Sequence, residues 1–84
     1  MKKALVIGVG PLNGLGAQLS KKIAKNDFEV FVAGRTKSSL EKVVDSISKD
    51  GNKAKAIVVN TTNESEVKAM MKSIGSGLDF AIYN

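Results

Sequence analysis

The chain has 84 residues, which suffices for one small domain and excludes a separate substrate domain. Thirteen residues are lysine or arginine and eight are acidic, so the formal net charge is +5; 43% are hydrophobic, as in a globular rather than a disordered chain. The lysines are scattered along the sequence, which argues against nucleic-acid binding, while the positive balance favours a phosphorylated ligand.

The sequence contains no cysteine and no histidine. It therefore excludes disulfides, thiol catalysis and a histidine-assisted serine, and it lacks the commonest zinc ligands, so we expect no metal site. Lys2 and Lys3 precede an apolar run at residues 4–9, as in a signal peptide, but the run is short and no cleavage site follows. No stretch approaches the roughly 18–20 apolar residues of a membrane span, and we expect a cytoplasmic protein with no membrane partner.

Four short apolar segments predict strands, and three of them are rich in β-branched or aromatic residues. They are residues 4–9, 28–33, 54–59 and 78–83. The first is apolar throughout, which is typical of a central parallel strand that is covered on both faces. The last is expected at the edge of the sheet, with unpaired backbone groups.

Three amphipathic segments between these strands predict helices that pack on the sheet. Their apolar stripes are Leu15, Leu19 and Ile23 in the first, Leu40, Val43, Val44 and Ile47 in the second, and Val67, Met70, Met71 and Ile74 in the third. The two methionines are expected to fill the core rather than to form a ligand surface.

Capping patterns indicate where two of these helices begin and end. Ser38 with Glu41, and Asn63 with Glu66, match the capping box, in which the two side chains each accept a hydrogen bond from the first turn. The expected C-terminal stops are Gly51 and Gly75.

The strict alternation predicts an α/β fold, β-α-β-α-β-α-β, with a parallel sheet joined by right-handed crossovers. We expect the strand order 3-2-1-4 of a Rossmann-type sheet, with the switch point between the first and fourth strands. Residues 1–84 are then the dinucleotide-binding part of a larger doubly wound domain.

A glycine-rich turn, Gly10–Gly16, joins the first strand to the first helix. Glycines there permit a tight turn and let the backbone approach a diphosphate, which the N–H groups and positive dipole end of the helix bind. The common fingerprint G-x-G-x-x-G does not fit, because Asn13 stands where its third glycine belongs. The spacing G-x-x-x-G-x-G fits, through Gly10, Gly14 and Gly16. The alternative is a turn that only packs the helix on the strand.

This spacing resembles that of the short-chain dehydrogenase/reductase family, and the resemblance covers the whole chain. The second strand ends in Ala33-Gly34-Arg35-Thr36, the third ends in Val59-Asn60-Thr61, and the fourth runs into Tyr83-Asn84 at the place of the family's Asn-Asn-Ala-Gly motif.

The sequence also departs from the family pattern. The family's threonine before the first glycine is replaced by Ile7 if the turn carries a two-residue insertion after Gly8, and by Val9 if it does not. Asn60 replaces an aspartate that contacts adenine in the family, and its side-chain carbonyl can accept a hydrogen bond from the adenine amino group. Tyr83 stands at the first asparagine place of the fourth-strand motif.

The residues after the second strand bear on the choice of dinucleotide. An acid there binds the ribose hydroxyls of NAD and repels a 2′-phosphate. Here Gly34 holds that position, and it is followed by Arg35, which can bind a phosphate bidentately, and Thr36, which adds a hydroxyl. We therefore expect NADP(H), with NAD(H) as the alternative. S-adenosylmethionine is less favoured, because its sites usually contain an acid at this place.

The expected cofactor-binding residues are Gly8, Gly10, Asn13, Gly14, Leu15, Gly16, Arg35, Thr36, Asn60, Thr61 and Asn84. The resemblance implies hydride transfer between the cofactor and a small-molecule carbonyl or alcohol substrate, through a serine and a Tyr-x-x-x-Lys pair. Tyr83, the only tyrosine, is followed by Asn84, so we expect no catalytic residue in this chain and interpret it as the N-terminal part of a longer NADP-dependent oxidoreductase. The alternative is a non-catalytic dinucleotide-binding or sensing module. In either case we expect a homo-oligomer.

Overall fold

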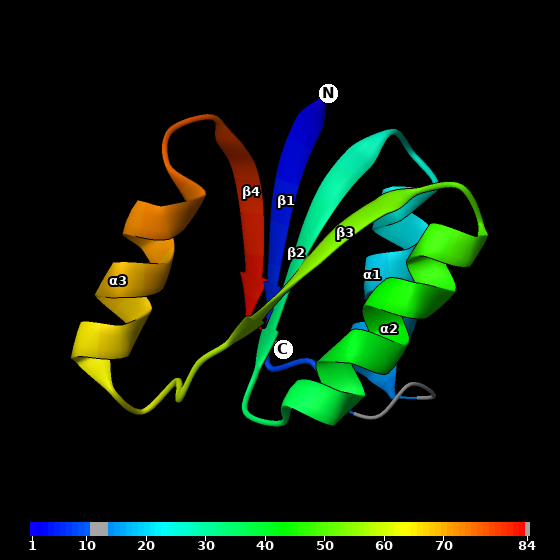
Figure 1. The fold of residues 1–84 in the computed structure, drawn as a ribbon. Coiled ribbons are helices and arrows are strands. Elements are labelled where there is room, and N and C mark those ends of the chain that lie inside the picture. Colours follow the sequence, from blue (N-terminus) through cyan, green and yellow to red (C-terminus); the bar gives the residue numbers. More distant parts are fainter. Residues whose placement is uncertain (11–13, 84) are drawn as a thin grey trace.

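The computed structural model describes residues 1–10 and 14–83. Its elements are β1 (Lys2–Ile7), α1 (Leu15–Ala24), β2 (Phe28–Gly34), α2 (Lys37–Lys49), β3 (Lys53–Val58), α3 (Glu64–Ile74) and β4 (Leu78–Tyr83). Every strand pairing is parallel and the order is β3-β2-β1-β4, which confirms the predicted Rossmann-type topology. Helices α1 and α2 cover one face of the sheet and α3 covers the other (Figure 1). Within the described ranges, no helix is long and apolar enough to cross a membrane.

Side chains of the two central strands, β1 and β2, point alternately to opposite faces of the sheet and form two cores. The core under α1 and α2 includes Val6, Val30, Val32, Leu40, Val43 and Ile47. The core under α3 includes Leu5, Ile7, Phe31, Ala33, Met70 and Ile74. Burial on both faces explains why residues 4–7 of β1 and 30–33 of β2 are all apolar.

Helix α1 packs on the sheet through a different stripe from the one that the sequence predicted. Its buried residues are Gly16, Ala17, Ser20 and Ala24. Leu15 is 75% exposed, and Leu19 and Ile23 are only half-buried. The buried side chains are small, which lets the helix lie close to the strands, and the Ser20 hydroxyl donates a 2.8 Å hydrogen bond to the Gly16 carbonyl. The sequence prediction chose the most apolar stripe of the helix, because apolarity does not show how much space separates a helix from a sheet.

Two strands begin earlier than predicted. Strand β1 starts at Lys2 and ends at Ile7, because Gly8 has a φ of 90° and turns the chain out of the sheet. Strand β3 starts at Lys53 and ends at Val58. The added residues are lysines, whose charged side chains are compatible with a strand wherever they reach solvent.

Strand β4 lies at the edge of the sheet, as predicted, and exposes part of its apolar surface. Phe80 is 36% exposed and Tyr83 is 69% exposed. The Phe80 ring reaches over β1 and meets the ring of Phe28 edge-to-face, with centroids 5.2 Å apart. On α3, Met70 fills the core but Met71 is 42% exposed, so the expectation for the methionine pair is half wrong.

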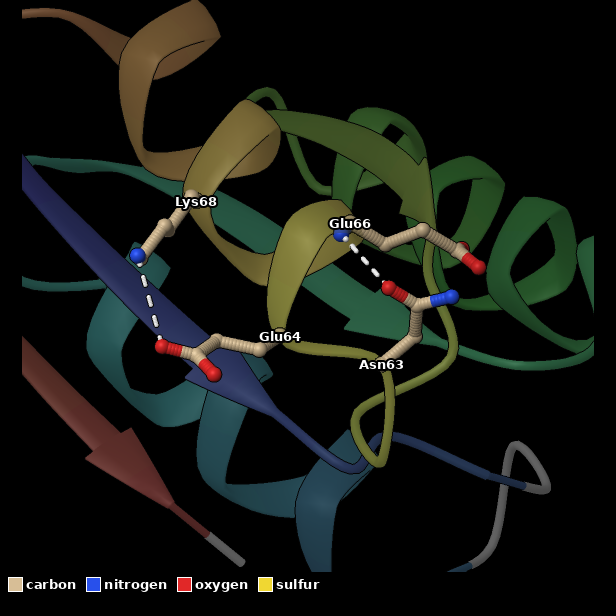
Figure 2. A network of polar contacts seen from close by, with 4 residues as sticks. All are labelled: Asn63, Glu64, Glu66 and Lys68. Carbon is tan, nitrogen blue, oxygen red and sulfur yellow. Dashed lines mark hydrogen bonds and ion pairs between the residues drawn. The ribbon is translucent and has the colours of Figure 1, made fainter.

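The N-terminus of α3 is capped by the predicted residue. Asn63 Oδ1 accepts a 3.1 Å hydrogen bond from the Glu66 backbone N–H, and Figure 2 shows this bond near the Glu64–Lys68 ion pair. The second half of the capping box is wrong, because the Glu66 carboxylate accepts a hydrogen bond from the Asn60 backbone N–H instead.

The predicted capping box of α2 is wrong. The helix begins at Lys37 with Thr36 as its N-cap, which places Ser38 inside the first turn rather than before it, and the Thr36 side chain makes no capping hydrogen bond. The sequence pattern does not distinguish Thr36 from Ser38 as the N-cap, because the first residue of α2 depends on where β2 ends. Both predicted C-terminal stops are confirmed, each with a φ of 80°, at Gly51 and Gly75.

Replacing Asn63 by alanine is expected to lower the free energy of unfolding by about 1 kcal/mol, because the Glu66 N–H loses its acceptor. Ser38→Ala is the matched control. Ser38 is exposed and does not cap its helix, so the expected change is within about 0.5 kcal/mol. Urea unfolding followed by circular dichroism measures both values, and equal losses would contradict the assignment of the cap.

Candidate functional site

The carboxyl ends of β1, β2 and β3 lie at one end of the sheet, where the segments that follow them line a cleft of about 260 Å³. Its walls are Gly8, Val9, Gly10, Gly34, Arg35, Thr36 and Thr61. Figure 1 shows that all three helices begin at this end of the sheet. In open parallel sheets, ligands bind in the crevice outside the carboxyl ends of the strands, so this cleft is the candidate site.

Backbone hydrogen bonds hold the three strand ends together. The N–H groups of Gly8 and Val9 both donate to the Ala33 carbonyl, at 2.8 and 2.9 Å. The Val59 N–H donates to the Gly34 carbonyl at 2.8 Å. Each bond joins the segment after one strand to the last residues of β2, so the floor of the cleft continues the hydrogen bonding of the sheet.

Gly34, the last residue of β2, lies where no side chain fits. A Cβ at this position would be 2.3 Å from the Val9 carbonyl oxygen and 3.3 Å from Leu40 Cδ2. The Val9 backbone has little freedom to retreat, because its N–H is bound to Ala33. The end of β2 therefore carries no carboxylate, and the first side chain after it belongs to Arg35.

In its described part, residues 8–10, the turn after β1 meets the cleft through two glycines and Val9, whose side chain is buried in the core under α1 and α2. A Cβ at Gly10 would meet nothing within 4 Å, so the space beside this residue is open. Helix α1 has Gly14 as its N-cap, with no capping side chain and no acidic residue in its first turn. The N–H groups and positive dipole end of this helix are therefore suited to an anion.

Helix α2 also begins at the cleft without a capping side chain. Its N-cap, Thr36, lines the cleft, and its first turn contains Lys37 and no acidic residue. Arg35 is exposed, and in the described parts of the chain its guanidinium takes part in no ion pair. This wall of the cleft therefore combines a free cation with the positive end of a helix dipole.

The segment after β3 brings Asn60 and Thr61 to the same end of the sheet. Thr61 lines the cleft, and Asn60 is half-buried. Asn60 Oδ1 accepts two hydrogen bonds from Thr62, one from its N–H at 3.1 Å and one from its Oγ1 at 2.7 Å. Both lone pairs of this oxygen are therefore used, and the carbonyl does not provide the free acceptor that we expected for an adenine amino group.

The structure brings most of the predicted cofactor-binding residues to one end of the sheet. Five of them are walls of the cleft: Gly8, Gly10, Arg35, Thr36 and Thr61. Three form the start of α1: Gly14, Leu15 and Gly16. Asn60 follows β3 at the same end of the sheet but is not a wall of the cleft, and Asn13 and Asn84 lie outside the described residues. Val9 and Gly34 also line the cleft but were not predicted. The Val9 carbonyl approaches Gly34, and Gly34 has no side chain, so neither residue is marked by a side chain that suggests ligand binding.

A larger hollow, of about 730 Å³, lies along α3. Its lining residues are Val67, Lys68, Ala69, Met71 and Lys72. All of them belong to one helix, so polar groups from several elements do not converge there as they do in a typical ligand site. We therefore assign the candidate site to the cleft at the strand ends.

A parallel sheet of this order, with a glycine-rich turn and helix starts at its carboxyl edge, defines the Rossmann-type class of fold. The family model described as short chain dehydrogenase matches residues 2–81, and the chain belongs to this family. Among curated proteins, none matches the chain.

Solved structures with a similar fold extend well beyond the length of this chain. A variant of actinorhodin polyketide ketoreductase with NADPH aligns with 99% of this chain and 32% of its own, at 22% identity and a TM-score of 0.89. A short-chain dehydrogenase from Rhodopseudomonas palustris aligns with 99% of this chain and 39% of its own, at 29% identity and a TM-score of 0.86. A short-chain type dehydrogenase/reductase from Mycobacterium marinum aligns with 95% of this chain and 33% of its own, at 31% identity and a TM-score of 0.86.

Gly34→Ala is expected to lower the free energy of unfolding by about 1–3 kcal/mol, because the Val9 carbonyl must move away from the new methyl group. Gly10→Ala makes the same chemical change where nothing lies within 4 Å, and its expected effect is below about 1 kcal/mol in either direction. Denaturant titration of the two variants measures this difference. Equal stabilities would contradict the close approach of β2 to Val9.

Proposed function

We propose that this chain is the cofactor-binding part of an NADP(H)-dependent short-chain oxidoreductase. The observation that carries the proposal is the wall of the cleft after β2. There Arg35 and the uncapped start of α2 line the cleft, while the backbone contact of Gly34 leaves no room for a side chain. An acid at the end of β2 is the feature that selects NAD, and this backbone geometry excludes it.

The turn after β1 fits the diphosphate of a dinucleotide. The open space beside Gly10 lets a ligand approach the backbone, and the start of α1 adds N–H groups and a positive dipole end. None of the residues that line the cleft is acidic, so no carboxylate repels the phosphates. The lining thus suits a group with two negative charges.

The 2′-phosphate of NADP(H) fits the wall formed by Arg35 and Thr36. A guanidinium pairs with phosphate bidentately and stays charged at every relevant pH, and the N–H groups at the start of α2 add to the attraction. In support, the actinorhodin ketoreductase, whose fold is similar, is described with NADPH.

When bound, the cofactor supplies a nicotinamide that donates hydride to a carbonyl carbon or accepts it from an alcohol. The residues of this chain bind the diphosphate and the adenosine half, so their part is to position the cofactor. We assign the substrate pocket, the serine and the Tyr-x-x-x-Lys pair to further residues of a longer protein, because this chain spans 32–39% of the ketoreductase and Rhodopseudomonas palustris chains to which it is similar.

Arg35→Asp is expected to weaken the binding of NADPH relative to NADH by about 10- to 100-fold, because a charge-assisted contact to the 2′-phosphate becomes a repulsion. Lys42→Asp is the control, since Lys42 is exposed on α2, the helix that follows Arg35, and the change in net charge is identical. Isothermal titration calorimetry with each cofactor gives the two dissociation constants.

Two outcomes of this titration have different meanings. If Arg35→Asp leaves the ratio of the two dissociation constants unchanged, Arg35 does not bind the 2′-phosphate. If the unaltered chain binds neither cofactor, the proposed function itself is wrong.

A further inference from the structure

The turn between β3 and α3 holds Asn60 through several hydrogen bonds. The Asn60 N–H donates to Glu66 Oε1 at 3.0 Å, and its carbonyl oxygen accepts from the Asn63 N–H at 3.0 Å. Its side-chain oxygen accepts from both the N–H and the hydroxyl of Thr62. Glu66 is in turn bound by the Asn63 cap, which ties the turn to the first turn of α3. Backbone and side chain of Asn60 are therefore both held in place.

These contacts determine which end of the Asn60 amide is free. A backbone N–H can only donate, so the side-chain atom 3.1 Å from the Thr62 N–H must be the oxygen. The two Thr62 contacts occupy both lone pairs of that oxygen. What remains is Nδ2, which carries two N–H donors and no acceptor. In the described structure, neither Nδ2 nor the neighbouring Thr61 N–H has a hydrogen-bond partner.

The order of the strands puts the segment after β3, which contains Asn60 and Thr61, on the side of the cleft where the purine of a bound dinucleotide belongs. The diphosphate belongs at the turn after β1, and the adjoining ribose with its 2′-phosphate belongs at Arg35, after β2. The base is the next group along the ligand, and β3 is the next strand along the sheet. Thr61 already lines the cleft from that side, and Asn60 precedes it.

On the basis of the proposed function, we propose that Asn60 reads the purine of the cofactor as a hydrogen-bond donor, so that the site accepts a 6-oxopurine at least as well as adenine. Two neighbouring donors match the O6 and N7 acceptors of a 6-oxopurine. On the edge that carries N7, adenine offers one acceptor and presents an amino group at position 6, where a second donor finds no acceptor. On the edge that carries N1, each base offers one acceptor, which is N1 in adenine and O6 in a 6-oxopurine. The ligand class is thus a nicotinamide dinucleotide phosphate whose base is hypoxanthine or guanine as well as adenine.

The test compares NADPH with its 6-oxo analogue, reduced nicotinamide hypoxanthine dinucleotide phosphate, by calorimetric titration of the 84-residue chain. The unaltered chain is expected to bind the analogue at least as tightly as NADPH. Asn60→Asp replaces the Nδ2 donor by a carboxylate oxygen and keeps an acceptor for Thr62. This variant is expected to weaken the analogue relative to NADPH by about tenfold.

Asn52→Asp is the matched control, because it makes the same substitution next to the opposite end of β3 and is expected to leave the ratio unchanged. Thermal unfolding of all three proteins verifies that the variants are folded. Tighter binding of NADPH than of the analogue by the unaltered chain overturns the inference, and so does a ratio that Asn60→Asp does not alter. Binding of neither ligand overturns the proposed function as well.

Discussion

The Val9 carbonyl lies so close to Gly34 that the end of β2 has no space for a Cβ atom. The same segment donates two N–H groups to the Ala33 carbonyl, so the chain leaving β1 is bound across the end of β2. The end of β3 is joined to it through the bond from Val59 to Gly34. The ends of three strands thus share one backbone floor, and the side chains that surround the cleft come from residues beyond it, above all Arg35.

The three helices begin at the end of the sheet that carries the cleft (Figure 1), and they differ in what compensates the N–H groups and positive dipole at their N-termini. In helix α3 the Asn63 side chain accepts a hydrogen bond from the Glu66 N–H, and Glu64 and Glu66 lie in the first turn, so its positive dipole end is compensated within the chain. Helices α1 and α2 have neither a capping side chain nor an acid in the first turn. The start of α2 lines the cleft through Thr36, and the start of α1 lies at the same end of the sheet (Figure 1). In the proposed complex, phosphate groups provide the compensating charge at both.

Much of the fold could be predicted from the sequence, because its signals are local. Short apolar segments indicated the strands and amphipathic stripes indicated the helices, and burial on both faces accounts for the apolar runs at residues 4–7 of β1 and 30–33 of β2. Helix α1 shows where this reasoning ends. Its buried face is small rather than apolar, since Ala17 and Ser20 fit against the sheet while Leu15 reaches solvent. The space between a helix and a sheet depends on both partners, and neither sequence segment records it.

At the site, the sequence by itself determined the topology, the glycine spacing and the cation at Arg35, because each follows from the order of residues along the chain. Only the tertiary structure decided that Gly34 must lack a side chain, because the contact comes from Val9, which is distant in sequence. It also decided which atom of Asn60 is free, because a side-chain amide offers a donor and an acceptor, and the hydrogen bonds of the turn select between them.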